Sequence, residues 1–297
     1  VPLFAMLNDK GPYRFPYPLG NIVGGGSHAG PGTPDIQEVL VCPMGARSIM
    51  EALETNFIIH KQVRTVLEKI DNRFTYGRGD EGAWAPNVNN DEAVSIVVQA
   101  VENAGLRVGK DVALGIDFAS SSIWDSTRKI YDYSRQGLVR NTEEQIGFVE
   151  DLIKNYHLIY AEDPVNEDDF ESMALLTKRN KNCLITGDDM LVTSTDRLHD
   201  ACKYGACNGA ILKVNQAGTL YNALDFADNC SKNNIKIITS HRSGESIDAH
   251  ISHIAIATSS KMIKTGVVGG ERVSKLNELL RLSEYDLIKG MIDLSFT

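Results

Sequence analysis

The sequence has few cysteines, no long apolar run and no dense cluster of basic residues. Its five cysteines form no CxxC pair, which is typical of a reduced intracellular protein whose cysteines are structural. No apolar stretch is long enough to cross a bilayer, and the start shows no signal-peptide pattern, so we expect a cytoplasmic protein without a membrane span. A formal net charge of −9 and the absence of a Lys/Arg-rich run argue against nucleic acid as a primary partner.

The sequence also lacks low-complexity stretches and any linker rich in proline, glycine and serine. With 297 residues, 42% of them hydrophobic, the chain is long enough to fill the core of one large barrel. We therefore predict a single domain over residues 1–297, with 1–15 as a lead-in segment.

Six short apolar runs recur along the chain at intervals of about one strand–helix–loop unit, and each leads into a charged or polar residue. These residues are Asp117, Glu162, Asp188, Lys213, His241 and Lys264. Amphipathic helical patterns lie between the runs, for example over 142–153. Parallel strands with functional groups at their C-terminal ends are typical of an α/β protein of the TIM-type (β/α)8 barrel class, whose active site lies at that face. We predict that three carboxylates, two lysines and a histidine converge at one mouth of the barrel.

The first third of the chain is less regular than the rest. Two helical patterns, 46–70 and 91–104, follow one another, so the barrel does not begin with plain strand–helix alternation. Glycine-rich loops at 24–30 and 77–82 each hold ionisable residues among the glycines. Such loops are either flexible connections or places where the backbone approaches a ligand closely, and we favour the second interpretation.

Asp117, Glu162 and Asp188 suggest a metal site, because crowded carboxylates repel one another unless a cation lies between them. Oxygen ligands without histidine or cysteine suit Mg²⁺ or Mn²⁺ better than Zn²⁺. The alternative is that the three acids are structural, as exposed loop residues or helix caps.

Lys213 and Lys264 are expected to face these acids. A lysine beside a second cation and Mg²⁺ has its ammonium form disfavoured, which lowers its pKa and suits it to act as a base. The alternative is that both lysines only form salt bridges with the acids. The loop 240–245 offers hydroxyls, an imidazole and a guanidinium that can bind a phosphate or carboxylate.

Several motifs resemble those of the enolase family, specifically its C-terminal barrel domain. They include Gly-Gly-Ser-His-Ala-Gly (25–30), Gly-Asp-Glu-Gly (79–82), Leu-Lys-Val-Asn-Gln (212–216), Ser-His-Arg-Ser-Gly-Glu (240–245) and Ile-Lys-Thr-Gly (263–266). The motifs at 212–216 and 240–245 are together highly specific for this family. The resemblance implies a barrel whose irregular first half contains an antiparallel strand.

The resemblance also implies an activity, the reversible dehydration of 2-phospho-D-glycerate to phosphoenolpyruvate in glycolysis and gluconeogenesis. Such an enzyme is a Mg²⁺-dependent carbon–oxygen lyase with a small-molecule substrate, and the family binds two Mg²⁺ per site, with Mn²⁺ as a possible substitute. Lys213 matches the general base at C2, and Glu81 matches the acid that protonates the departing C3 hydroxyl. Asp117, Glu162 and Asp188 match the ligands of the first metal ion.

Further residues match positions that contact the substrate in the family. They are His28, Glu38, Ser240, His241, Arg242, Ser243 and Lys264. Arg242 and Ser243 are the best placed of these for the phosphate.

The chain departs from the family pattern in two loops. Gly24 stands where the family usually has asparagine, and Ala83-Trp84 follows Gly82 where the family usually has a second glycine. Both departures change the shape of a loop without removing an ionisable group.

The family's N-terminal α+β capping domain has no counterpart in the sequence, which starts Val1-Pro2 without methionine. One mobile loop of that domain supplies a serine to the second Mg²⁺, so we expect this chain alone to be poorly active. The full-length family members are homodimers or larger homo-oligomers.

The sequence leaves two alternative functions. The first is that of another member of the enolase superfamily, which would act on a different carbon acid. Against it, the loops at His28 and 240–243 resemble those of the phosphoglycerate-specific branch. A non-catalytic binding or scaffold protein on the same fold is the alternative from another class, because a fold does not determine an activity. The presence of every expected ionisable group argues against it.

Overall fold

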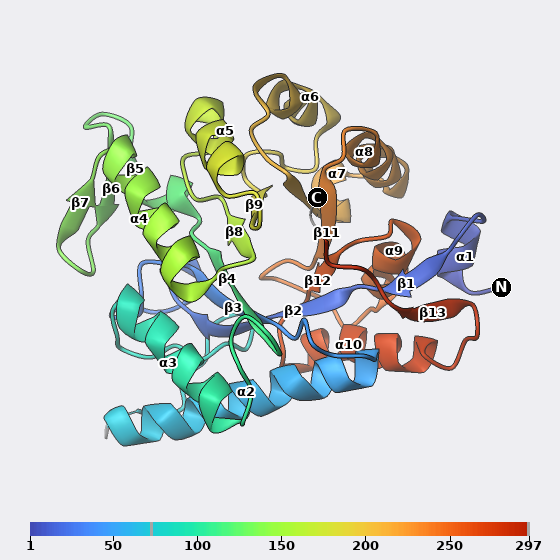
Figure 1. Cartoon of the computed structure of the whole chain (residues 1–297), viewed down its shortest axis with the longest axis horizontal. Coiled ribbons are helices and arrows are strands. Elements are labelled where there is room, and N and C mark those ends of the chain that lie inside the picture. The colour runs from blue at the N-terminus through green and yellow to red at the C-terminus, as the bar shows by residue number, and fades with distance from the viewer. Residues whose placement is uncertain (72–73, 296–297) are drawn as a thin grey trace.

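The computed structural model describes residues 1–71 and 74–295, within which eight strands form a closed barrel (Figure 1). In order around the barrel they are β2 (Tyr17–Gly24), β3 (Glu38–Cys42), β4 (Ala113–Asp117), β8 (Tyr160–Glu162), β9 (Leu184–Gly187), β10 (Gly209–Leu212), β11 (Lys236–Ser240) and β12 (Met262–Lys264), which pairs with β2 again. Strand β3 is antiparallel to both of its neighbours, and the other pairs are parallel. The predicted barrel with an antiparallel strand in its first half is confirmed.

Helices surround the barrel on its outside (Figure 1). They are α2 (Ile49–Ile70), α3 (Asn90–Asn103), α4 (Thr142–Tyr156), α5 (Phe170–Arg179), α6 (Thr195–Tyr204), α8 (Leu220–Lys232), α9 (His250–Ala257) and α10 (Gly270–Leu282). Both α2 and α3 lie between β3 and β4 in the chain, which explains the irregular first third of the sequence. Each begins at a polar cap, since the Ser48 side chain accepts from the Glu51 backbone and Asn89 forms a capping box with Glu92.

Smaller elements lie outside the barrel. The helix α1 (Leu3–Leu7) and the strand β1 (Tyr13–Phe15) lead in, and β1 pairs in parallel with β13 (Ile288–Met291), so the first and last described segments are neighbours. A three-stranded sheet between β4 and α4 consists of β5 (Trp124–Asp125), β6 (Ile130–Tyr133) and β7 (Leu138–Arg140). The short helix α7 (Val214–Ala217) follows β10 directly.

The core has two layers that follow from the period-two alternation of the strands. Ala161, Ile185 and Leu212 belong to the large cluster that packs beneath the helices, whereas Tyr160 and Ile211, the preceding residues of two of these strands, belong to a separate cluster. Because successive side chains point to opposite faces, the second cluster fills the barrel interior.

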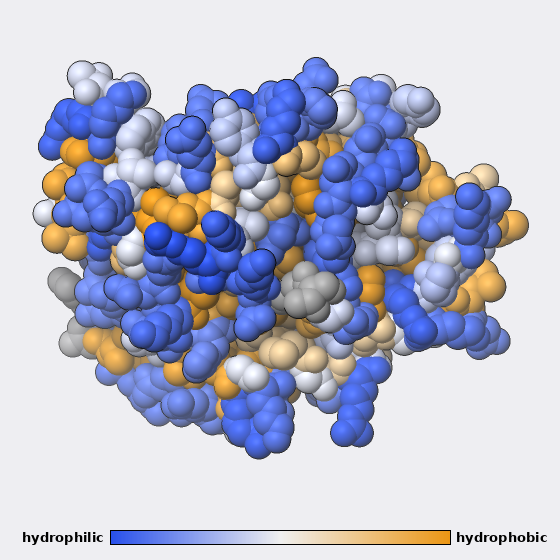
Figure 2. Space-filling view, turned by 45° about the horizontal axis from the view of Figure 1, so that its top comes forward, coloured by the Kyte–Doolittle hydropathy of each residue, from blue (hydrophilic) through white to orange (hydrophobic). Residues whose placement is uncertain are grey.

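The outer surface is mixed in character. On the face shown in Figure 2, hydrophilic side chains cover most of the surface and apolar ones show between them. Among the described residues, no helix is both long enough and apolar enough to span a membrane.

Candidate active site

A polar cavity of about 220 Å³ lies at the C-terminal ends of the barrel strands. Eleven of the twelve predicted site residues line it: His28, Glu38, Glu81, Asp117, Asp188, Lys213, Ser240, His241, Arg242, Ser243 and Lys264. The twelfth, Glu162, is completely buried beneath it and contacts Lys264. A larger depression of about 690 Å³, lined by loops that precede β4, β8 and β9, contains none of the predicted residues.

Strand register explains how three of the acids come together. Asp117 is the last residue of β4 and pairs with Glu162, the last residue of β8. Glu38 is the first residue of β3 and pairs with Asp117, because an antiparallel strand starts where its parallel neighbours end. Glu38 therefore reaches the mouth although no apolar run precedes it in the sequence.

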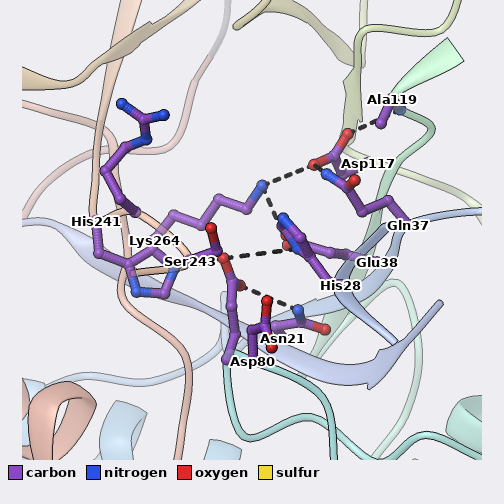
Figure 3. A network of polar contacts seen from close by, with 12 residues as sticks. Asn21, His28, Gln37, Glu38, Asp80, Asp117, Ala119, His241, Ser243 and Lys264 are labelled. Carbon is purple, nitrogen blue, oxygen red and sulfur yellow. Dashed lines mark hydrogen bonds and ion pairs between the residues drawn. The ribbon is translucent and has the colours of Figure 1, made fainter. Parts of the chain in front are cut away.

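The Lys264 ammonium contacts all three of these acids, and Figure 3 shows it beside Asp117 and Glu38. Its Nζ is 2.7 Å from Glu162 Oε2 and 3.1 Å from both Asp117 Oδ2 and Glu38 Oε2. Burial lowers the pKa of Lys264, but the charges of Asp117, Glu162 and Glu38 outweigh burial and raise it well above its ordinary value. Lys264 is therefore a firmly held cation in this arrangement.

Lys213 makes a similar contact on the other side of the mouth. Its ammonium donates to Asp188 Oδ2, and its backbone N–H donates to Thr193 Oγ1 at 2.9 Å. Burial lowers the pKa of Lys213, yet Asp188 and Glu162 outweigh burial and raise it. Without a bound cation, more carboxylates than cations surround each ammonium and raise its pKa, whereas the expected lowering of the lysine pKa values presupposes bound Mg²⁺. Both lysines form the salt bridges of the alternative interpretation.

Two of the three predicted metal ligands have an oxygen free for a divalent cation, whereas both oxygens of Asp117 already accept hydrogen bonds. Glu162 Oε1 and Asp188 Oδ1 are buried and have no hydrogen-bond partner within the described protein. Burial, and next the neighbouring charge of Asp117, outweigh Lys264 and raise the pKa of Glu162 well above its ordinary value, so its ionised form is only partly compensated. Because these free atoms are carboxylate oxygens, the donor set suits a hard cation such as Mg²⁺.

Asp163 supports this acid group from behind. Its two carboxylate oxygens accept from the backbone N–H groups of Asp188 at 3.1 Å and Asp189 at 2.7 Å. Oxygen atoms of these three aspartates lie within 4.8 Å of one another, close enough to share a cation. Since both oxygens of Asp163 already accept hydrogen bonds, its main effect is to orient the loop that carries Asp188.

A second group of ionisable side chains forms the opposite wall. Glu81 Oε1 lies 3.2 Å from His241 Nε2 and 3.8 Å from His28 Nδ1, and Glu81 Oε2 accepts from Asn21 Nδ2 at 3.1 Å. His28 Nδ1 is also 3.4 Å from Glu38 Oε1. The two glutamates therefore share one histidine between them.

Of these two glutamates, Glu38 is the one whose pKa is raised. Burial, and next the charge of Glu81, raise the pKa of Glu38 to about 7. Burial also acts to raise the pKa of Glu81, but His241, Lys264 and His28 outweigh it and hold that pKa well below its ordinary value. Near neutral pH the structure thus places an ionised Glu81 opposite a Glu38 that can be protonated.

The raised pKa of Glu38 predicts that the free energy of unfolding falls as the pH rises from its ordinary value of 4.5 to about 7. In this window the unfolded carboxyl has lost its proton while the folded one keeps it, so the folded state binds more protons. In Glu38→Gln the free energy of unfolding should fall less over the same pH range. Denaturant unfolding of both forms at several pH values, in the absence of divalent cations, measures the effect.

Glu54→Gln is the matched control, because Glu54 is exposed on α2 and far from this group. It should leave the pH dependence unchanged. An equal fall of stability in the parent protein and in Glu38→Gln would show that Glu38 does not retain its proton.

Comparison with known proteins decides the family of this barrel. The sequence model of the enolase C-terminal TIM barrel domain matches residues 12–290. The chain belongs to the enolase family. The enolase of Methanosphaera stadtmanae is 44% identical over 295 residues, which cover 99% of this chain and 71% of that enolase. The enolase of Methanothermobacter thermautotrophicus is 41% identical over 100% of this chain and 71% of its own length. That of Pyrobaculum aerophilum is 41% identical over 96% of this chain and 68% of its own.

The two departures from the usual enolase pattern are neighbours in space. A Cβ atom on Gly24 would lie 3.4 Å from the Cβ of Ala83, and the Gly24 N–H donates to the Trp84 carbonyl at 2.8 Å. Side chains at residues 24 and 83 would therefore be in van der Waals contact, so the two departures from the family pattern adjoin each other.

Trp84 anchors the loop that carries Glu81 to helix α2. Its Nε1–H donates to the His60 carbonyl at 2.8 Å, and its ring stacks on the His60 ring at a centroid distance of 4.8 Å. The His60 ring in turn donates from Nε2 to the Gly82 carbonyl at 2.9 Å. This enolase-family loop is thus held at its backbone on the C-terminal side of the acid.

Some residues of the site carry no role in the sequence interpretation. Gln37 donates to Asp117 Oδ2 at 3.1 Å, and the Tyr160 hydroxyl donates to Glu162 Oε2 at 2.5 Å. Tyr160 precedes Glu162 by two residues and so shares its face of the strand, a signal that sequence reasoning could have used. Arg272 is buried behind the loop 240–243 and lies outside every strand-end pattern.

Proposed function

We propose that this chain catalyses the reversible dehydration of 2-phospho-D-glycerate to phosphoenolpyruvate with bound Mg²⁺. The observation that carries the proposal is the membership of the enolase family, with enolase relatives 41–44% identical over nearly the whole chain. The polar cavity at the barrel mouth supports it, since lysines face carboxylates there in a site that is largely shielded from water.

Asp117, Glu162 and Asp188 would hold the first Mg²⁺, with Mn²⁺ as a substitute and a second Mg²⁺ as in the family. When bound, the cation stabilises the dianion that forms as the substrate loses its C2 proton. The two free buried oxygens of Glu162 and Asp188 support this assignment.

Lys213 is the proposed base. As an amine it takes the proton from C2 onto Nζ, and the electron pair of the C–H bond moves into the substrate carboxylate. Its contact with Asp188 points Nζ into the cavity. Neutralisation of the acids around it would weaken their hold on the ammonium and bring its pKa closer to a useful range.

Glu81 is the proposed acid for the second step. The C3–O bond breaks, its electron pair leaves with the hydroxyl, and a proton from Glu81 completes the water molecule. The lowered pKa favours the ionised form, which in the reverse direction takes a proton from the attacking water, whereas in the forward direction Glu81 must first bind the proton that it delivers. The C2 electron pair meanwhile forms the double bond of phosphoenolpyruvate.

The remaining cavity residues are proposed to hold the substrate. Arg242 and Ser243 lie on the 240–243 loop and would bind the phosphate through a guanidinium and a hydroxyl. Lys264 would offer its ammonium to the substrate carboxylate. The other proposed contacts are His28, Glu38, Ser240 and His241.

Asp188→Asn tests the metal assignment. We expect the variant to bind Mg²⁺ at least about tenfold more weakly in a calorimetric titration, because an amide oxygen lacks the full charge that attracts a hard cation. Thermal stabilisation by Mg²⁺ should decrease in parallel. Phosphoenolpyruvate formation, measured in the longest form of the protein that the gene encodes, should fall with it.

Asp200→Asn is a suitable control, since Asp200 lies on α6 and pairs with Lys203 on an exposed surface. Its Mg²⁺ affinity should equal that of the parent protein. Unchanged Mg²⁺ affinity in Asp188→Asn would remove Asp188 from the metal site.

A further inference from the structure

Arg272 reaches the active-site wall from helix α10, although its side chain is completely shielded from solvent at 1% exposure. Its Nη1 donates to His241 Nδ1 at 2.7 Å and to the Arg242 carbonyl at 2.6 Å. Its Nη2 donates to the Asp80 carbonyl at 3.0 Å and to the Ser243 carbonyl at 2.6 Å. One guanidinium thus contacts both loops that carry the proposed acid and the proposed phosphate-binding residues.

The chemistry of these contacts determines where the imidazole proton of His241 lies. A guanidinium has five N–H donors, no acceptor, and stays charged in proteins. Nδ1 of His241 must therefore present its lone pair to Arg272. The ring hydrogen is left on Nε2, which lies within ion-pair distance, 3.2 Å, of the carboxylate oxygen Glu81 Oε1, a group that can accept it.

The charges around His241 favour the same state. Burial lowers its pKa, Glu81 acts to raise it, and Arg272 and Lys264 act with burial to lower it. Without Arg272, a carboxylate beside a ring with a free Nδ1 would instead favour the doubly protonated imidazolium.

We propose that Arg272 is a positioning residue that holds His241 as a neutral ring with its hydrogen on Nε2, so that His241 donates a hydrogen bond to Glu81 rather than carrying a proton itself. The same side chain clamps the Asp80-Glu81 backbone to the 240–243 loop. The effect on turnover, though not the state of the ring, rests on the role proposed above for Glu81.

Nuclear magnetic resonance of the imidazole nitrogens tests the proposal in the Mg²⁺-loaded protein. After ¹⁵N labelling of histidine, the signals of His241 are identified by their loss in His241→Gln. We expect an unprotonated Nδ1 and a protonated Nε2 at pH 7, with the imidazolium appearing only below the ordinary histidine pKa of 6.5. A hydrogen on Nδ1, or an imidazolium at pH 7, would overturn the proposal without the need for any variant of Arg272.

Arg272→Met then removes the donors and the charge while keeping an unbranched apolar side chain. We expect the imidazolium signal of His241 to appear at a pH at least about one unit higher than in the parent protein. Arg272→Lys keeps the buried charge and should keep the ring neutral, so it serves where the methionine variant does not fold. Arg281→Met is the control, because Arg281 lies on the same helix but pairs with Glu278 at the surface.

Equal His241 signals in the parent protein, Arg272→Met and Arg281→Met would contradict the proposal. The nitrogen signals do not depend on turnover. If the parent protein holds the expected ring state but forms no phosphoenolpyruvate, the proposed function fails and this inference stands. If the parent protein forms phosphoenolpyruvate but the His241 ring is protonated at pH 7, this inference fails and the proposed function stands.

Discussion

Lys213→Ala is expected to abolish exchange of the C2 proton of 2-phosphoglycerate with deuterated solvent. Within the described part of the chain, the other lysine that lines the cavity is Lys264, and it is engaged by Glu38, Asp117 and Glu162. General base catalysis contributes about 10²–10⁴-fold. A thousandfold loss corresponds to about 4 kcal/mol of transition-state stabilisation. Proton exchange is followed by nuclear magnetic resonance of the substrate, in the longest form of the protein that the gene encodes.

Lys203→Ala provides the comparison, because Lys203 pairs with Asp200 on the exposed side of α6. It should exchange the C2 proton at the parent rate. Mg²⁺ affinity of Lys213→Ala must be measured alongside, since Lys213 contacts Asp188. Retention of exchange at the parent rate by Lys213→Ala would show that another group is the base.

Glu81→Gln is expected to block formation of phosphoenolpyruvate while sparing the C2 exchange. The amide keeps the size of the side chain, and its single oxygen can accept from one of Asn21 and His241, whose N–H groups face the two Glu81 oxygens. It cannot deliver a proton to the C3 hydroxyl, so only the second step is lost, again by about 10²–10⁴-fold. Exchange and product formation are measured on the same samples.

Glu171→Gln on the exposed face of α5 should leave both rates unchanged. If Lys213→Ala and Glu81→Gln lost the C2 exchange equally at equal Mg²⁺ affinity, the division of roles between base and acid would be wrong. If Glu81→Gln formed product at the parent rate, Glu81 would not be the acid.

The sequence alone determined the architecture and which residues after the apolar runs gather at the mouth of the barrel. Apolar runs of strand length at regular intervals predict parallel strands, and the structure has β4, β8, β9, β10, β11 and β12 at these places. Five of the six polar residues after these runs line the cavity, and Glu162 lies beneath it, because the C-terminal ends of parallel strands lie at one face. Local signals also placed the helices, as the Asn141 cap at the start of α4 illustrates.

Only the tertiary structure decided which groups contact one another and in which protonation state. Lys264 meets Asp117 across 147 residues of sequence because closure of the barrel brings β12 to the same mouth as β4. Glu38 joins them because β3 runs antiparallel, a direction that no local pattern encodes. The lysine pKa values rise instead of falling because the number of carboxylates around a buried ammonium depends on this packing. The four contacts of Arg272 arise in the same way, from loops brought together by the barrel and not by the chain.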